Sequence, residues 1–250
     1  MDKAYWDSLA PSFERNVLEV SERDAAGTLN QTIHSFAGKR KDVIDLGCGA
    51  GAMLHVLSKK FRHVSAVDFS SALLDKARQR TPANNINFIQ HDLRRPLARS
   101  LRADISICVN VLIDPDPRCR ESIMNTLSAA TKRGGATIIV VPAIESVLHV
   151  YRILVDIHTK AGISHARATA DANKLFAREV ISPVGGVVRV GGTATKHHSS
   201  DELLTALRAA RFHPIELKKV EYPWSEELDG APPGLTCARP WDWLAIGEKR

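Results

Sequence analysis

Residues 43–52 of the chain read Val-Ile-Asp-Leu-Gly-Cys-Gly-Ala-Gly-Ala, and this stretch decides the fold. A short apolar run leads into glycines at positions 47, 49 and 51, and a helical pattern follows over residues 51–60. Glycines allow the backbone to turn tightly and let a ligand approach it without a Cβ in the way. The stretch therefore predicts a buried strand, a ligand-binding loop and a helix, in that order.

The chain outward from this stretch alternates short apolar runs with helical patterns. Such alternation is typical of a parallel sheet covered by helices, the doubly wound α/β fold. Two extended runs near the C-terminus predict an antiparallel pair added to the sheet edge. The expected strands are residues 43–47, 63–69, 86–92, 103–113, 136–142, 213–224 and 241–249, and the expected helices of this part are 3–19, 22–37, 51–60, 71–80 and 117–132.

The sequence predicts one domain over residues 1–250, because no repeat and no long linker divides it. Residues 1–40 are expected to form an N-terminal helical cap, 41–142 the ligand-binding core, and 199–250 the C-terminal part of the sheet. Residues 143–198 interrupt the alternation with two helical patterns and a glycine-rich stretch. Long insertions in compact domains are usually functional, so we expect this one to cover the active face as a lid.

Composition excludes several classes of protein. Of the 250 residues 44% are hydrophobic and 25% charged, which is ordinary for a globular protein. No apolar stretch approaches the roughly 20 residues of a membrane helix, and no secretory signal is visible, so we expect a cytoplasmic protein with no membrane partner. The net charge of +6 permits a nucleic-acid partner without requiring one. The four cysteines lack metal-ligand spacing, and no metal site is expected.

Acidic residues stand at the ends of the predicted strands. Asp45 lies two residues ahead of Gly47, where a carboxylate would repel a pyrophosphate but suits a cationic ligand with an amino group. Asp68 ends the second predicted strand, where a carboxylate can accept hydrogen bonds from both hydroxyls of a ribose. Asp92 ends the third strand and Asn110 lies within the fourth. The carboxyl ends of these strands are therefore the expected binding edge.

Together these residues resemble the first motif of the class I S-adenosylmethionine-dependent methyltransferases, an acidic residue followed by three alternating glycines. The resemblance is firm over residues 40–142 and looser over 199–248. It implies S-adenosylmethionine as cofactor, with Asp92 toward the adenine amine and Asn110 beside the reacting methyl. The implied cofactor site comprises Tyr5, Trp6, Asp45, Gly47, Cys48, Gly49, Gly51, Asp68, Phe69, Asp92, Leu93 and Asn110.

The resemblance also suggests where the acceptor would bind. The segment ahead of Ser199 passes the substrate mouth in such enzymes, so His197 and His198 are candidate general bases. Tyr5 and Trp6 resemble the helix that small-molecule methyltransferases fold over the cofactor. The residues after the fourth strand, Asn110-Val111-Leu112-Ile113, lack the proline-containing motif of enzymes that methylate adenine or glutamine amides.

The sequence thus favours a Rossmann-like enzyme that methylates an oxygen or nitrogen of a small molecule. Three alternatives stay open: an RNA methyltransferase, suggested only by the net charge; an NAD(P)-dependent oxidoreductase, since Gly47, Gly49 and Ala52 also fit a dinucleotide-binding loop; and an inactive regulatory subunit that binds the cofactor. The acceptor and the oligomeric state are not predicted.

Overall fold

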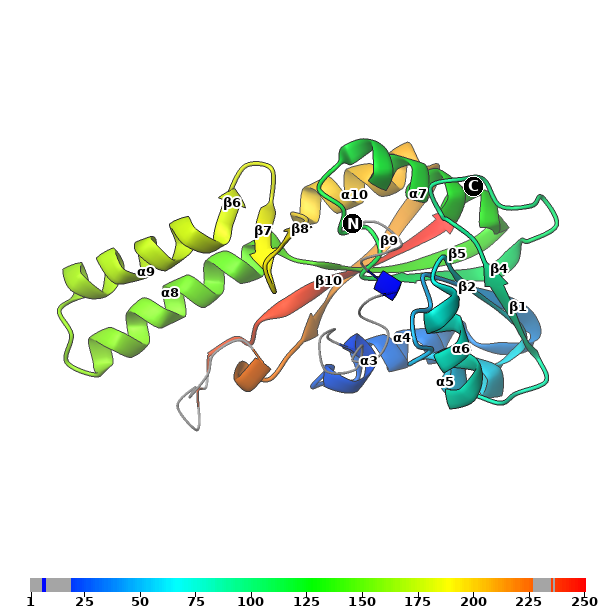
Figure 1. Ribbon diagram of the computed structural model, residues 1–250, viewed down its shortest axis with the longest axis horizontal. Coiled ribbons are helices and arrows are strands. Elements are labelled where there is room, and N and C mark those ends of the chain that lie inside the picture. Colours follow the sequence, from blue (N-terminus) through cyan, green and yellow to red (C-terminus); the bar gives the residue numbers. More distant parts are fainter. Residues whose placement is uncertain (1–5, 8–18, 227–234, 236) are drawn as a thin grey trace.

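The computed structural model describes residues 6–7, 19–226, 235 and 237–250. Its centre is a seven-stranded sheet in the order β3-β2-β1-β4-β5-β10-β9 with helices on both faces (Figure 1). The strands are β1 (Gly38–Leu46), β2 (Phe61–Asp68), β3 (Ile86–Gln90), β4 (Ala103–Val109), β5 (Thr131–Pro142), β9 (Phe212–Glu221) and β10 (Trp241–Lys249). The first five are parallel to their neighbours, whereas β10 runs antiparallel to both β5 and β9. The expected Rossmann-like sheet and its antiparallel C-terminal pair are confirmed.

The helices bury one apolar stripe each against the sheet. One face is covered by α4 (Thr28–Phe36), α5 (Leu54–Lys60) and α6 (Ser71–Arg80), whose leucines and alanines join one hydrophobic core. The other face is covered by α7 (Pro117–Ala130) and α10 (Ser200–Ala209), which contribute to a second core. Two layers of helix around one sheet leave only the strand ends open, and ligands of such folds bind at the carboxyl ends.

Side-chain caps fix where three of these helices begin. Ser70 accepts a hydrogen bond from the Leu73 amide, so α6 covers the predicted residues 71–80. Ser199 accepts from the amide of Glu202, the contact that a capping box predicts, and α10 begins at the next residue. The chain leaves α10 through Arg211, which adopts φ of 63°. A residue in this left-handed conformation commonly ends a helix, although glycine is the usual choice.

Two predicted elements were wrong in extent. The helix expected over 22–37 is broken into α3 (Val20–Arg23) and α4, because Gly27 adopts φ of 68° between them. The strand expected over 103–113 stops at Val109, because Asn110 has φ of 53°, which extended backbone excludes. Most of the helix expected over 3–19 lies outside the described residues. No helix within the described ranges is long and apolar enough to span a membrane.

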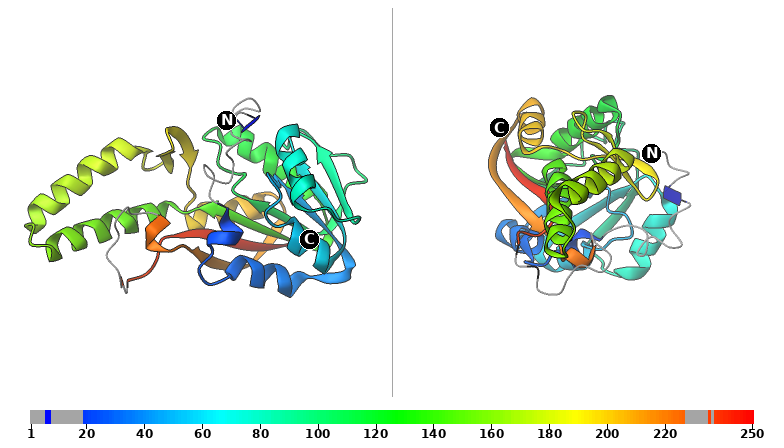
Figure 2. Two further views of the ribbon diagram at one scale, coloured as in Figure 1. Left: turned by 60° about the horizontal axis from the view of Figure 1, so that its bottom comes forward. Right: turned by 90° about the vertical axis from the view of Figure 1, so that its left-hand side faces the viewer.

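The insertion forms a projecting arm, defined here as residues 144–196. Helices α8 (Ile144–Lys160) and α9 (His165–Glu179) lie side by side and extend away from the sheet (Figures 1 and 2). The glycine-rich stretch after them folds into a small antiparallel sheet of β6 (Val180–Ser182), β7 (Val187–Val190) and β8 (Thr193–Lys196). A two-helix arm cannot bury all of its apolar side chains, and exposed large ones remain at Leu148, Ile163, Leu175, Ile181, Val184 and Val190.

The root of the arm is fastened to the carboxyl edge of the sheet by backbone hydrogen bonds. The amide of Lys196 donates to the carbonyl of Ile113 at 2.8 Å, and that of His198 donates to Pro142 at 2.7 Å. The amide of Ile144 in turn donates to the carbonyl of His198 at 3.1 Å. The two chains of the arm therefore meet where β5 ends, beside the loop after β4.

Candidate cofactor and substrate site

A cavity of about 190 Å³ opens at the carboxyl ends of β1, β2, β3 and β4. The loop after each of these strands contributes to its wall, so residues far apart in sequence meet there. Among the predicted site residues, those that line the cavity are Trp6, Gly47, Cys48, Gly49, Asp68, Phe69, Asp92, Leu93 and Asn110. Asp45 and Gly51 lie in the same loop without lining it, and Tyr5 lies outside the described residues.

The glycine loop requires its glycines for two separate reasons. Gly47, Gly49 and Gly51 all adopt positive φ, at 81°, 53° and 82°, where other residues are strained. Two of them also face close neighbours: a Cβ on Gly47 would lie 2.3 Å from Cγ2 of Val111, and one on Gly51 would lie 2.9 Å from Cβ of Ala77. The loop is thus packed tightly between β4 and α6, with its backbone left bare toward the cavity.

Asp45 is buried beneath the glycine loop. Its side chain is 1% exposed, and neither carboxylate oxygen has a hydrogen-bond partner among the described residues. Burial raises the pKa of this carboxyl to about 7, and the charge of Asp68 raises it further in the same direction. A buried carboxylate without a counter-charge favours a positively charged ligand above it.

Asp68 ties the loop to the end of β2. One carboxylate oxygen accepts from the amide of Gly49 at 3.0 Å and the other from the amide of Ser70 at 2.9 Å. Burial raises the pKa of Asp68, although these hydrogen bonds act to lower it. Each oxygen can accept a further hydrogen bond, so this wall residue can also hold the two hydroxyls of a ribose.

Asp92 follows β3 and is held by Arg94. The guanidinium donates to both carboxylate oxygens, at distances of 2.7 to 3.0 Å, and lowers the pKa of Asp92. Leu93 is buried beside it on the wall. Asp92 is therefore ionised but already shares its charge with an arginine, unlike Asp45.

Asn110 lines the cavity directly after β4 and belongs to a buried polar group that continues into β10. Its side-chain amide donates to Asp242, whose other partner is the hydroxyl of Tyr222 at 2.7 Å. Burial raises the pKa of Asp242 to about 6, against the effect of both hydrogen bonds. The Oδ1 atom of Asn110 is buried with no partner among the described residues.

Several wall residues were missed by sequence reasoning. Glu19, Val20 and Ser21 reach the cavity from the N-terminal side, and Val111, Ile113, Asp114, Cys119 and Ile123 from the segment after β4. One signal was available for the group behind the wall, because Asp242 stands between two tryptophans in an otherwise apolar strand. An acid in such a strand is buried, and a buried acid requires partners.

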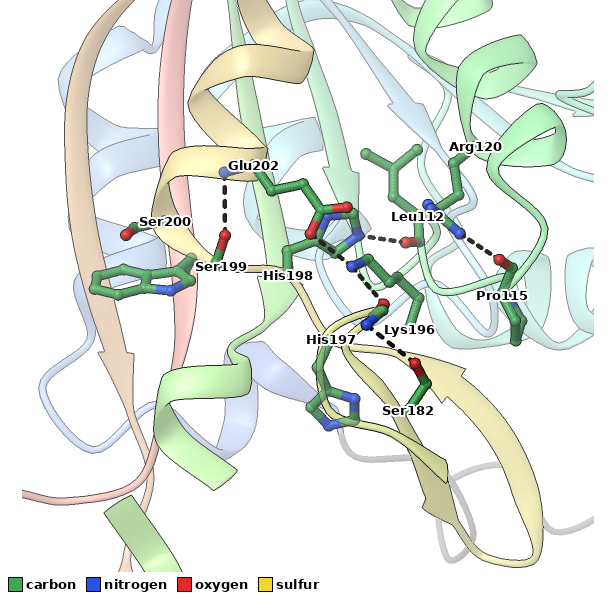
Figure 3. Close-up of polar contacts among 12 residues, drawn as sticks. Leu112, Pro115, Arg120, Ser182, Lys196, His197, His198, Ser199, Ser200 and Glu202 are labelled. Atoms are coloured by element: carbon green, nitrogen blue, oxygen red, sulfur yellow. Dashed lines mark hydrogen bonds and ion pairs between the residues drawn. The ribbon is translucent and has the colours of Figure 1, made fainter. Parts of the chain in front are cut away.

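The structure does not bring His197 and His198 to the cavity wall. Both are buried at the root of the arm, and their side chains point in opposite directions (Figure 3). Nε2 of His198 lies 2.8 Å from the carbonyl of Leu112, and the neighbouring Lys196 forms an ion pair with Glu202 at 2.6 Å. Burial lowers the pKa of each histidine to about 4. Both rings are neutral at pH 7, and their role as general bases stays a prediction.

The arm also contributes no residue to the described wall of the cavity. Its helices extend away from the carboxyl edge rather than across it (Figure 1). The lid role expected for residues 143–198 therefore stays a prediction, and this structure shows only where the arm is anchored.

The polar atoms of the cavity fit S-adenosylmethionine residue by residue. Asp68 can accept from the ribose hydroxyls and Asp92 from the adenine amine, while the buried charges of Asp45 and Asp242 favour a cationic group over the glycine loop. The bare loop backbone leaves space for the ligand chain, and Phe69 and Leu93 supply apolar walls. A pyrophosphate would instead lie over the uncompensated carboxylate of Asp45.

Comparisons with known proteins agree with this site. Residues 43–135 match the family model of the methyltransferase domain. A ubiquinone biosynthesis O-methyltransferase from Coxiella burnetii is 33% identical over 100 residues, which are 39% of this chain and 42% of that protein. The chain thus aligns with less than half the length of the curated relatives that it matches.

Solved structures show the same fold over nearly the whole chain. A methyltransferase from Anabaena variabilis has a TM-score of 0.65 at 16% identity, covering 99% of this chain and 93% of that one. The 1,6-didemethyltoxoflavin-N1-methyltransferase of Burkholderia thailandensis, solved with its substrate and S-adenosylhomocysteine, has a TM-score of 0.62 at 15% identity, with coverages of 99% and 86%.

The glycine loop, the strand-end acids and the sheet order all lie within or around the matched segment. Through residues 43–135, the chain belongs to the class I S-adenosylmethionine-dependent methyltransferases.

Proposed function

We propose that this protein transfers the methyl group of S-adenosylmethionine to an oxygen or nitrogen of a small organic molecule. The observation that carries the proposal is the glycine loop anchored to Asp68 above a buried, uncompensated Asp45. When bound, the cofactor supplies an activated methyl on a sulfonium, which an acceptor displaces in line. The protein has to align the two and keep water out.

The wall beyond the cofactor residues supports a small and largely apolar acceptor. Val109, Val111, Ile113 and Ile123 line it from the segment that follows β4 and from α7. The few polar groups among them, such as Asn110 and Asp114, would fix the orientation of the acceptor. Such a wall aligns and desolvates a nucleophile, and an amine that is already nucleophilic needs no general base.

The same wall disfavours RNA as acceptor. Within the described residues, Arg94 is the arginine or lysine that lines the cavity, and its guanidinium is taken by Asp92. Binding a nucleic-acid backbone requires several cations that are free to contact phosphates. The relatives that carry a named acceptor, a ubiquinone precursor enzyme and a toxoflavin enzyme, also favour a small molecule. A cytoplasmic location stays a prediction from the sequence.

Calorimetry on the full chain tests the cofactor assignment. We expect S-adenosylmethionine and S-adenosylhomocysteine to bind, and NADH and NADPH not to bind. Binding of NADH or NADPH without S-adenosylhomocysteine would overturn the proposal in favour of an oxidoreductase.

A label-transfer assay then tests catalysis and the class of acceptor. S-adenosylmethionine labelled in its methyl group is incubated with the protein and a cell extract separated into RNA and small-molecule fractions. We expect label in the small-molecule fraction, at a rate that added salt changes little. Label confined to RNA would contradict the proposal, and cofactor binding without any transfer would indicate a regulatory subunit.

A further inference from the structure

The polar group of Asn110, Asp242 and Tyr222 links the cavity wall to the sheet edge, and nothing in the proposed chemistry yet uses it. Tyr222 ends its strand next to β10, and its hydroxyl donates to Oδ2 of Asp242 at 2.7 Å. Asp242 is 7% exposed and stands opposite Pro142, at the carboxyl end of β5. Asn110 lies on the cavity wall. The group therefore runs from the far edge of the sheet to the cavity.

Asp242 decides which way the amide of Asn110 points. An ionised carboxylate accepts hydrogen bonds and donates none, so the partner that Asn110 presents to Asp242 is its NH2 group. The Oδ1 atom must then point away from Asp242. That atom is buried and has no partner among the described residues, and buried acceptors in folded proteins are rarely left in this state.

The backbone at Asn110 reinforces this orientation. Its φ of 53° is uncommon for a residue other than glycine, and such conformations are retained where the surrounding structure fixes them, often at functional sites. The next residue, Val111, packs against Gly47, so Asn110 stands beside the glycine loop. A ligand group that reaches this loop lies within the same end of the cavity.

The chemistry of the site selects a positively charged hydrogen-bond donor. Asn110 offers an acceptor atom, and the carboxylate of Asp242 lies one hydrogen bond behind it. Asp45, the acid expected from the sequence to suit an amino group, is not among the described residues of the wall. We propose that Asn110 Oδ1, held in orientation by Asp242 and Tyr222, accepts a hydrogen bond from the α-ammonium group of the bound cofactor. Asp242 is thus a positioning residue, and the inference rests on the proposed cofactor site.

The test compares two ligands that differ only in this group. S-adenosylhomocysteine and its analogue without the α-amino group are titrated by calorimetry into the full chain and into the variants Asn110→Ala and Asp242→Asn. The wild type is expected to bind the analogue at least about 10-fold more weakly, the effect of one charge-assisted hydrogen bond. In both variants this ratio should fall toward 1, with affinity for the analogue largely kept.

Two further variants separate the role from general damage. Tyr222→Phe keeps the ring and removes the hydroxyl that holds Asp242, and it should lower the ratio by a smaller factor. Asp171→Asn makes the same chemical change as Asp242→Asn on the distant arm and should leave the ratio unchanged. Folding of each variant is checked by its near-ultraviolet circular dichroism.

An unchanged ratio in Asn110→Ala would overturn the inference, even if Asp242→Asn failed to fold. A reduced ratio in Asn110→Ala with an unchanged ratio in folded Asp242→Asn would remove Asp242 as the positioning residue. If the wild type bound neither ligand, the proposed cofactor site itself would be wrong, which is a different result.

Discussion

The glycine loop and the root of the arm both hold buried titratable groups at the same edge of the sheet, but they are built differently. Around the loop, carboxylates lie on or just beneath the wall of a cavity, and Asp45 and Asn110 present acceptor atoms that have no partner in the described structure. At the root, His197 and His198 are buried away from that wall, among backbone hydrogen bonds that fasten the arm. Burial alone therefore does not mark a site, whereas burial of unpartnered groups at a cavity does.

The largest effect is expected from Gly49→Val, which would test whether the loop backbone is the binding surface. Gly49 has φ of 53° and donates its amide to Asp68, and a β-branched side chain is strained in that conformation. We expect affinity for S-adenosylhomocysteine, measured by calorimetry, to fall about 100-fold or more while the protein stays folded. Binding at wild-type affinity would show that the ligand does not lie on the loop.

The two regions should respond to acid in opposite directions. His197 and His198 have a pKa of about 4 when folded and about 6.5 when unfolded, so the unfolded state takes up protons first as the pH falls. Their contribution to stability is present above pH 6.5 and is lost between pH 6.5 and 4, by up to about 3 kcal/mol for each ring. Asp45 behaves oppositely, because its raised pKa of about 7 makes the folded state gain protons first. Its stabilisation grows as the pH falls from 7 to its unfolded value.

Urea unfolding of variants at pH 7.5 and pH 5 measures this contrast. Replacing both histidines by glutamine should reduce the loss of stability on acidification, and Asp45→Asn should increase it. The same direction of change in both variants would contradict the account of the two regions.

A smaller effect separates the two acids of the cofactor site. Asp68→Ala removes the carboxylate that holds the Gly49 amide and would bind the ribose, so we expect calorimetric affinity for S-adenosylhomocysteine to fall about 10-fold or more. Asp92→Ala should cost less, because Asp92 already shares its charge with Arg94. Asp75→Ala, on an exposed turn of α6, is the control. A larger loss in Asp92→Ala than in Asp68→Ala would reverse the two assignments.

The smallest effect is expected at the arm. Ser199→Ala removes the side chain that caps α10 next to the root and should lower the free energy of unfolding by about 1 kcal/mol. Cofactor affinity should not change, since Ser199 lies off the described cavity wall. Thermal unfolding and calorimetry on the same sample check both points, and a weakened affinity would tie the root to the cofactor site.

The sequence predicted the parts of this molecule that local chemistry determines. Apolar runs and caps placed the strands and α6, and the spacing of Asp45, Gly47 and Asp68 placed the cofactor loop. Arg211 takes the left-handed conformation that the sequence analysis allows at the end of α10 in place of glycine. These features depend on neighbours within a few residues of each other along the chain.

The rest depends on contacts between distant segments. The burial of His197 and His198 follows from hydrogen bonds to Ile113 and Pro142, more than 50 residues away, which no local pattern encodes. The strand after Asp104 ends early because Asn110 bonds to Asp242 from another strand and adopts a left-handed backbone. The projection of the arm likewise depends on how two half-buried helices pack, and the pattern alone suggested a cover.

Hydrogen exchange with and without S-adenosylhomocysteine tests the central claim most directly, because it reads both regions in one sample. The account predicts added protection of the amides of the glycine loop, of Phe69 and Leu93 and of the segment after β4, with the arm and residues 196–198 unchanged. Protection at the arm root without protection of the glycine loop would contradict it.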